Sequence, residues 1–199
     1  MTLIKRSEVN VNYAIRLLLI AVLLCAGCAK TGHHYTDPAV GLGYIKKIAI
    51  LPLENFTARK GIEERSRELL TTRILGHGLY EVVEKGELHR FLRDEIRSNE
   101  KELIDQRVAK RMAREFNIEA YIAGSVDEFT EVRNGSYTYP EIAISLRMVD
   151  IKTGNVVWKA SHHANGYSTA GRLFGLTAED TNSVLFRLID DLLATLSES

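Results

Sequence analysis

Two pairs of adjacent histidines are the first residues in this sequence whose type suggests chemistry, because imidazole is a common metal ligand. The pairs are His33-His34 and His162-His163. Adjacent residues on a strand point to opposite faces, so His162 and His163 do not chelate one ion easily. No cysteine or closely spaced carboxylate completes a ligand set near either pair. We therefore expect solvated histidines, no metal site and no cofactor.

Other residues with catalytic potential lack the sequence context that catalysis requires. Gly41-Leu42-Gly43 precedes an expected strand, whereas a dinucleotide-binding loop follows one. The sequence contains no Gly-x-Ser-x-Gly nucleophile elbow. Asp190 and Asp191 lie near the end of an expected helix, where surface carboxylates are common. The sequence thus favours a non-enzymatic protein without catalytic residues.

Cys28 is the residue whose context indicates a covalent modification. Nine residues from Leu17 to Cys25 form an apolar run, basic residues precede this run, and Ala26-Gly27 stand directly before Cys28. A transmembrane helix needs about 20 apolar residues, whereas the apolar part of an export signal needs roughly 7–15. The N-terminus therefore predicts export.

This arrangement resembles the signal peptide of bacterial lipoproteins, although Cys25 stands where those peptides usually carry Leu. The resemblance implies cleavage before Cys28 and acylation of Cys28, for example with palmitate. Ala29 follows the cysteine, and the absence of Asp there favours the outer membrane over the inner membrane. An ordinary cleaved signal peptide, with Cys28 unmodified, is the alternative.

The composition of the mature chain limits its partners. The leader holds three basic residues and one acidic residue of the 26 of each sign, so the mature chain has a net charge of −2. No basic stripe suggests nucleic-acid binding. Cys28 is the one cysteine after cleavage, so the mature chain forms no internal disulfide.

These observations divide the chain into three parts. We expect a signal peptide over residues 1–27, a lipidated cysteine with a flexible tether over 28–43, and a periplasm-facing α/β domain over 44–199. The tether is polar and rich in turn residues. A flexible chain of about 15 residues spans roughly 20–25 Å on average and about 50 Å at most. The domain should therefore stay near the membrane.

Apolar periodicity predicts a single α/β domain of order β-α-β-α-α-β-β-β-α. A mixed sheet covered by helices would hold a parallel β-α-β part followed by an antiparallel meander. Asn134-Gly135 is a strong turn signal between two strands of the meander. The expected strands lie at 46–53, 80–83, 120–126, 142–149 and 156–160, and the expected helices at 62–74, 88–96, 104–116 and 181–196.

Four segments then reveal a family resemblance. They are Ile48–Thr57, Tyr80–Glu84, Ala120–Val126 and Leu146–Trp158. Their order and spacing resemble the superfamily that contains CsgG of curli secretion, the penicillin-binding-protein activator LpoB and the amino-terminal domain of TolB. The resemblance covers nearly all of residues 44–196. It implies an envelope protein that binds other proteins or assembles, and it implies no catalysis.

Two functions within this superfamily can be tested against the sequence. A curli-type channel inserts hairpins with an apolar lipid face into the membrane, but the strands around Asn134-Gly135 carry Asp127, Glu128, Glu131 and Arg133. A regulator of a peptidoglycan synthase has to extend from the membrane to that enzyme. The tether is too short for this task unless the synthase comes close to the membrane. The leading hypothesis is a lipid-anchored interaction or assembly module of an envelope complex, for which a homo-oligomer is one option. The secretion channel of curli type and the regulator of a peptidoglycan synthase are kept as alternatives.

Four residues are candidates for contact with a partner protein. Phe56 lies in the loop after the first strand, where it either anchors a partner or packs over the sheet edge. Tyr167, Leu173 and Phe174 lie in a glycine-interrupted loop that forms either a docking surface or a lid folded back on the sheet.

Overall fold

A computed structural model describes residues 13, 32–39, 41–98, 104–135, 137–167 and 177–197. The chain divides into residues 1–31, of which Tyr13 alone is described, and the unit Gly32–Ser199. Cys28 and the predicted signal peptide lie outside the described residues, apart from Tyr13, so their assignment stays a prediction. No helix among the described residues is long and apolar enough to cross a membrane.

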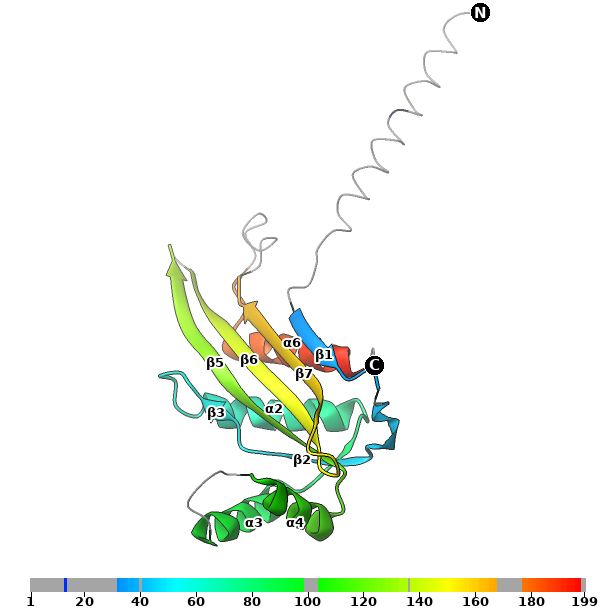
Figure 1. The fold of residues 1–199 in the computed structure, drawn as a ribbon. Coiled ribbons are helices and arrows are strands. Elements are labelled where there is room, and N and C mark those ends of the chain that lie inside the picture. The colour runs from blue at the N-terminus through cyan, green and yellow to red at the C-terminus, as the bar shows by residue number, and fades with distance from the viewer. Residues whose placement is uncertain are drawn as a thin grey trace, which may run out of the picture. The chain divides into compact units, whose positions relative to one another are not determined.

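A seven-stranded mixed sheet forms the centre of the second unit (Figure 1). Its order is β1-β7-β6-β5-β2-β4, and β3 pairs with β5 beyond the end of β2. The strands are β1 (Gly32–Thr36), β2 (Lys47–Ile50), β3 (Glu54–Asn55), β4 (Glu81–Val82), β5 (Ala120–Asn134), β6 (Tyr137–Asp150) and β7 (Val156–Asn165).

The strand directions confirm the predicted division of the sheet. β2 runs parallel to both β4 and β5, whereas β5, β6, β7 and β1 pair with one another in antiparallel order. The β5–β6 hairpin turns directly after Asn134, which still pairs with Tyr137, and Gly135 in the turn has a φ of +63°. Glycine adopts this left-handed conformation without the steric cost that a side chain brings.

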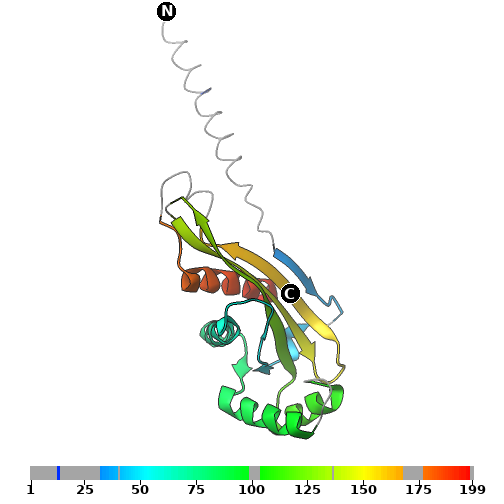
Figure 2. The same cartoon turned by 90° about the vertical axis from the view of Figure 1, so that its left-hand side faces the viewer.

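Two helices cover one face of the sheet. They are α2 (Ile62–Gly76) and α6 (Thr181–Ser197), and Figure 2 shows them on the same side. Their apolar stripes meet alternate residues of β5, β6 and β7 in the larger core. Trp158 of β7 is fully buried there, and its Nε1 donates a hydrogen bond of 2.9 Å to Thr195 Oγ1 of α6. We call this side the closed face.

Two more of the described helices, α3 (Lys85–Ser98) and α4 (Gln106–Phe116), cover only part of the opposite face. A second, smaller core joins them to β2, to the residues around β4 and to the first half of β5, with Ala49, Leu51 and Ala123 from the sheet side. In Figures 1 and 2 they lie at the end of the sheet where β5 begins. The same face of β6, β7 and the distal part of β5 lies beyond this core, and we call it the open face.

Two features differ from the sequence prediction in detail. Strand β1 lies at Gly32–Thr36, inside the range expected to be tether, because its backbone pairs with β7 from Gly32↔His162 to Thr36↔Trp158. A single 3-10 turn, η1 (Leu42–Tyr44), follows, and Leu42 is buried. The hairpin strands are also longer than their apolar segments, since polar residues continue the β5–β6 pairing as far as Asn134↔Tyr137.

Candidate functional site

The open face carries a row of small polar side chains across three strands. Asp127 of β5 accepts hydrogen bonds of 2.5 Å from both Ser125 Oγ and Ser145 Oγ. The Ser145 hydroxyl also lies 2.8 Å from the Ser161 hydroxyl of β7. Asp127 stands at a register shift between Val126 and Glu128, which lets its carboxylate lie over the sheet. This face is suited to contact with a polar partner surface.

The loop between β3 and α2 is held rigidly at the border of the open face. The Asn55 side chain donates hydrogen bonds to the Arg59 carbonyl (2.9 Å) and to Glu63 Oε2 (2.7 Å), and its oxygen accepts from the Thr57 backbone (2.9 Å). The Phe56 backbone N–H donates to the Val126 carbonyl at 3.0 Å. These bonds fix both sides of Phe56.

Phe56 is the most exposed of the large apolar side chains that the structure describes, with 68% of its surface accessible. Its ring therefore does not pack over the sheet edge, which was one of the two possibilities left by the sequence. Strand alternation places Phe56 on the same side as Glu54. A fixed, exposed aromatic ring is the kind of residue that dominates protein–protein binding energy.

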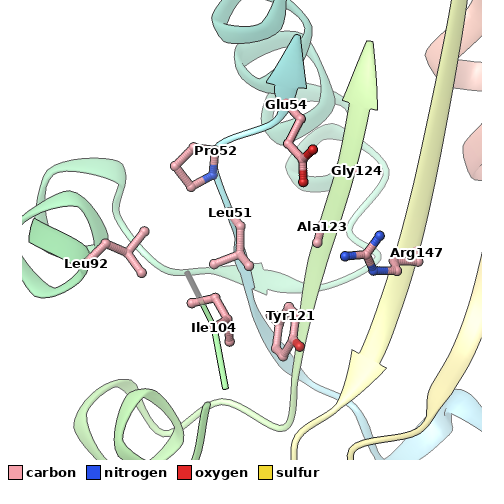
Figure 3. A pocket seen from close by; sticks show the side chains of 9 residues that line it. All are labelled: Leu51, Pro52, Glu54, Leu92, Ile104, Tyr121, Ala123, Gly124 and Arg147. Carbon is pink, nitrogen blue, oxygen red and sulfur yellow. The ribbon is translucent and has the colours of Figure 1, made fainter. Parts of the chain in front are cut away.

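A crevice opens next to this loop, between the open face and α3 (Figure 3). Its volume is about 360 Å³. Leu51, Pro52, Leu92, Ile104 and Ala123 form its apolar part, and Glu54, Tyr121, Gly124 and Arg147 complete the lining.

The crevice lies where the direction of chain progression reverses. From β2 the chain passes through α2 to β4 on one side, and then through α3 and α4 to β5 on the other side of β2. Residues Leu51 to Glu54 follow the carboxyl end of β2 at this point. In open α/β sheets such a position commonly holds a binding site, because the loops diverge and leave a gap.

Opposite charges lie on the two sides of the crevice. Glu54 of β3 pairs in register with Ser125 on one side of β5, and Arg147 of β6 pairs with Ala123 on the other side. In Figure 3 the charged ends of both residues approach β5 near Ala123. Burial raises the pKa of the Tyr121 hydroxyl, and nearby Arg147 opposes this only partly, so the phenol stays protonated at neutral pH.

The other aromatic candidate, Tyr167, lies at the distal end of the sheet. It is buried, and its ring stacks on Tyr137 at 5.1 Å between centroids and lies 5.4 Å from Tyr139. Tyr167 therefore contributes to a tyrosine cluster. Leu173 and Phe174 lie outside the described residues, as does Cys28.

His162, Asp190 and Asp191 take part in polar contacts that join elements of the fold to one another. His162 Nε2 lies 3.4 Å from an Asp191 carboxylate oxygen, between β7 and α6. Asp190 receives two hydrogen bonds from the Arg73 guanidinium, of 2.6 and 2.8 Å, which join α6 to α2. Within the described part of the chain, no group of three or more potential ligands could hold a metal ion.

The sequence did not single out Glu54, Tyr121 or Arg147. Their only signal in the sequence was position, since Glu54 follows the first strand and loops at that end of a parallel strand often form sites. Tyr121 and Arg147 occupy alternating positions inside strands, which do not distinguish them from other half-exposed residues. The register between β5 and β6 brings them to the crevice.

Comparison with known proteins identifies the family. Residues 53–163, more than half of the chain, match the family model described as peptidoglycan-synthase activator LpoB. The chain belongs to this family. The matched range contains the Phe56 loop, most of the residues that line the crevice and most of the open face. Of the superfamily suggested by the sequence, the LpoB branch is thus supported.

The solved structures that are similar in fold to this LpoB-family chain include the following two. The PelC dodecamer from Paraburkholderia phytofirmans is 19% identical, with 83% of this chain and 96% of that chain covered and a TM-score of 0.58. Lipoprotein GNA1162 from Neisseria meningitidis is 13% identical, with 77% and 99% covered and a TM-score of 0.53. The comparison with curated proteins gives no match. At these identities the two likenesses establish the fold alone.

Proposed function

We propose that this protein is a non-enzymatic, lipid-anchored accessory protein of the bacterial outer membrane that faces the periplasm and regulates a peptidoglycan synthase by binding it. Membership of the LpoB family, through residues 53–163, is the observation that carries this proposal. The short tether predicted from the sequence made a synthase regulator the less favoured alternative. The family match supports this function over the others.

The proposed contact surface is the Phe56 loop together with the adjoining open face. Phe56 supplies an apolar anchor whose backbone is already fixed, so little conformational entropy is lost when a partner covers it. The row around Asp127 and Ser145 supplies polar groups on the same side of the sheet. An anchor next to a polar surface matches the usual anatomy of a protein interface.

The anchor restricts where the partner is met. If Cys28 is lipidated, residues 29–31 alone connect it to β1, and an extended chain of that length spans at most about 14 Å. The synthase would therefore have to reach the immediate vicinity of the membrane. Replacement of Cys28 by Ser should abolish palmitate labelling and release the protein from the membrane fraction. Retention of both properties would contradict the anchor.

Binding to the synthase is tested with a matched pair of phenylalanine variants. Phe56→Ala should weaken binding of the full chain to the peptidoglycan synthase of the same cell by about 10- to 100-fold in Kd, as loss of an interface anchor does. Phe186→Ala removes a ring that is 37% exposed on α6, over the closed face, and should leave Kd unchanged. Surface-plasmon resonance with detergent-solubilised synthase measures both.

Two outcomes would overturn the proposal in different ways. Absence of binding by the unaltered protein would remove the synthase as partner. Equal binding by both variants would keep the synthase and reject the Phe56 surface. We further propose that the chain self-associates, and the mass of the protein alone in detergent tests this part, because a monomeric mass would exclude it.

A further inference from the structure

The crevice beside β5 has features of a small-ligand site that the proposed function does not use. It has an apolar floor and two opposite charges at its rim, from Glu54 and Arg147. Within the part of the chain that the structure describes, neither charge has a hydrogen bond or ion pair with a protein group. A volume of about 360 Å³ is within the range of pockets that hold small molecules.

The spacing of the two charges limits the length of a ligand. Glu54 and Arg147 belong to β3 and β6, which pair with β5 from opposite sides. Neighbouring strands are about 4.8 Å apart, and the two register positions, Ser125 and Ala123, differ by about 7 Å along β5, so the backbones that carry the two charges are about 12 Å apart. Both side chains reach inward, which shortens the gap between the charged ends. An extended dipeptide is about 7 Å long and carries one charge at each end.

We propose that this crevice binds a short peptide of about two residues with a free amino group and a free carboxylate. The ammonium group pairs with the Glu54 carboxylate, and the peptide carboxylate accepts hydrogen bonds from the Arg147 guanidinium and the Tyr121 hydroxyl. The floor formed by Leu51, Leu92 and Ala123 contacts small apolar side chains of the peptide.

The charge pattern selects this class of ligand over simpler ones. A ligand with only a carboxylate would gain the Arg147 contact but would place a negative charge close to Glu54. A ligand with only an ammonium group would gain the Glu54 contact but would place a positive charge close to Arg147. A zwitterion pairs with both charges of the rim, and the Tyr121 hydroxyl can donate a hydrogen bond because a phenol is protonated at neutral pH.

The direct test is calorimetric titration of the full chain in detergent with L-alanyl-L-alanine. Arg147→Gln and Glu54→Gln should each weaken binding by at least about tenfold, because each removes a hydrogen bond to a charged group. Lys159→Gln is the matched control. Lys159 pairs with Arg147 in register on β7 and lies outside the crevice, so its loss should change Kd by less than twofold.

A second ligand tests whether Glu54 binds the amino end of the peptide. N-acetyl-L-alanyl-L-alanine lacks the ammonium group and should bind the unaltered protein at least about tenfold more weakly than L-alanyl-L-alanine. The Glu54→Gln variant should bind the two ligands almost equally, because it lacks the carboxylate that would recognise the ammonium group.

Lack of binding by the unaltered protein at 50-fold excess over its concentration, or equal Kd for Arg147→Gln and Lys159→Gln, would overturn the inference. These results are separable from the proposed function, because a protein that fails to bind the peptide can still bind a synthase through Phe56. Circular dichroism of each variant confirms that it is folded, which is expected because both charged side chains are exposed.

Discussion

The closed and open faces of the sheet are built from the same strands and differ in almost every physical property. On the closed face, α2 and α6 bury alternate residues of β5, β6 and β7 in one continuous core. On the open face, the intervening residues present hydroxyls, an aspartate and an arginine. Because successive side chains of a strand point to opposite faces, one segment encodes a core and a contact surface at the same time.

The comparison also shows how stability and binding are separated in this fold. Apolar burial on the closed face supplies most of the stabilising free energy, because it scales with the apolar area removed from water. The open face can therefore carry exposed residues, such as Phe56, that cost the domain little. We expect variants of the two faces to divide into those that affect unfolding and those that affect binding.

The largest effect on stability is expected from Trp158→Ala on the closed face. Loss of a fully buried aromatic side chain should lower the free energy of unfolding by about 3–5 kcal/mol. The neighbouring change Lys159→Ala affects an exposed side chain on the open face and should stay within about 0.5 kcal/mol. Urea unfolding followed by circular dichroism measures the free energy of unfolding of both variants. Tryptophan fluorescence is unsuitable, because Trp158 is the single tryptophan and one variant lacks it. Similar losses for both would contradict the division into two faces.

A moderate effect is expected from Asp150→Asn at the end of β6. This buried carboxylate accepts hydrogen bonds from Tyr44 Oη (2.7 Å) and from Thr153 N (2.6 Å) and Oγ1 (2.7 Å), which fasten η1 and the β6–β7 turn to the sheet. The Asn variant should lose about 1–2 kcal/mol at pH 7, because the amide accepts with one oxygen only.

The pH dependence of Asp150 has a definite sign. Burial by itself would raise the pKa of Asp150, but the hydrogen bonds from Thr153 and Tyr44 together hold it below its usual value. The ionised carboxylate therefore stabilises the fold above about pH 4, and this contribution disappears as the pH falls through the lower pKa of the folded state. The difference between Asp150→Asn and the unaltered protein should shrink at pH 3. A constant difference would show that the charge has no part in it.

The smallest effect is expected from Ser145→Ala on the open face. The variant loses the hydrogen bonds to Asp127 and Ser161, but water can replace them, so the free energy of unfolding should fall by less than about 1 kcal/mol. Thermal unfolding at pH 7 measures the change. A loss as large as that of Trp158→Ala would mean that the open face is covered in the folded protein.

The fold was largely predictable because its signals are local. The apolar run from Ile48 to Leu53 predicted a central strand, and Asn134-Gly135 predicted the hairpin turn, as found. Strand β1 was missed because Gly32–Thr36 contains glycine, two histidines and no apolar stretch. Its pairing with β7 depends on backbone hydrogen bonds, which any residue except proline can donate, so the side chains give little signal.

The candidate site was predictable only in part. Phe56 was identified from its position after the first strand, but the sequence allowed it to be either packed or exposed. The crevice was not foreseen, because Glu54, Tyr121 and Arg147 come from β3, β5 and β6 and are as much as 93 residues apart in the chain. The alternation within each strand gives the face on which a residue lies, but not its neighbour on the next strand.

The sequence by itself determined the order of the main elements from β2 onward and the two-sided pattern of the strands, because these depend on periodicity and on short local motifs. Export of the chain stays a prediction from the sequence. The tertiary structure decided which part of the sheet stays uncovered, that Phe56 is exposed, and that opposite charges flank one crevice. Those properties arise from strand register and helix placement, and both are set by the packing of segments that are distant in the sequence.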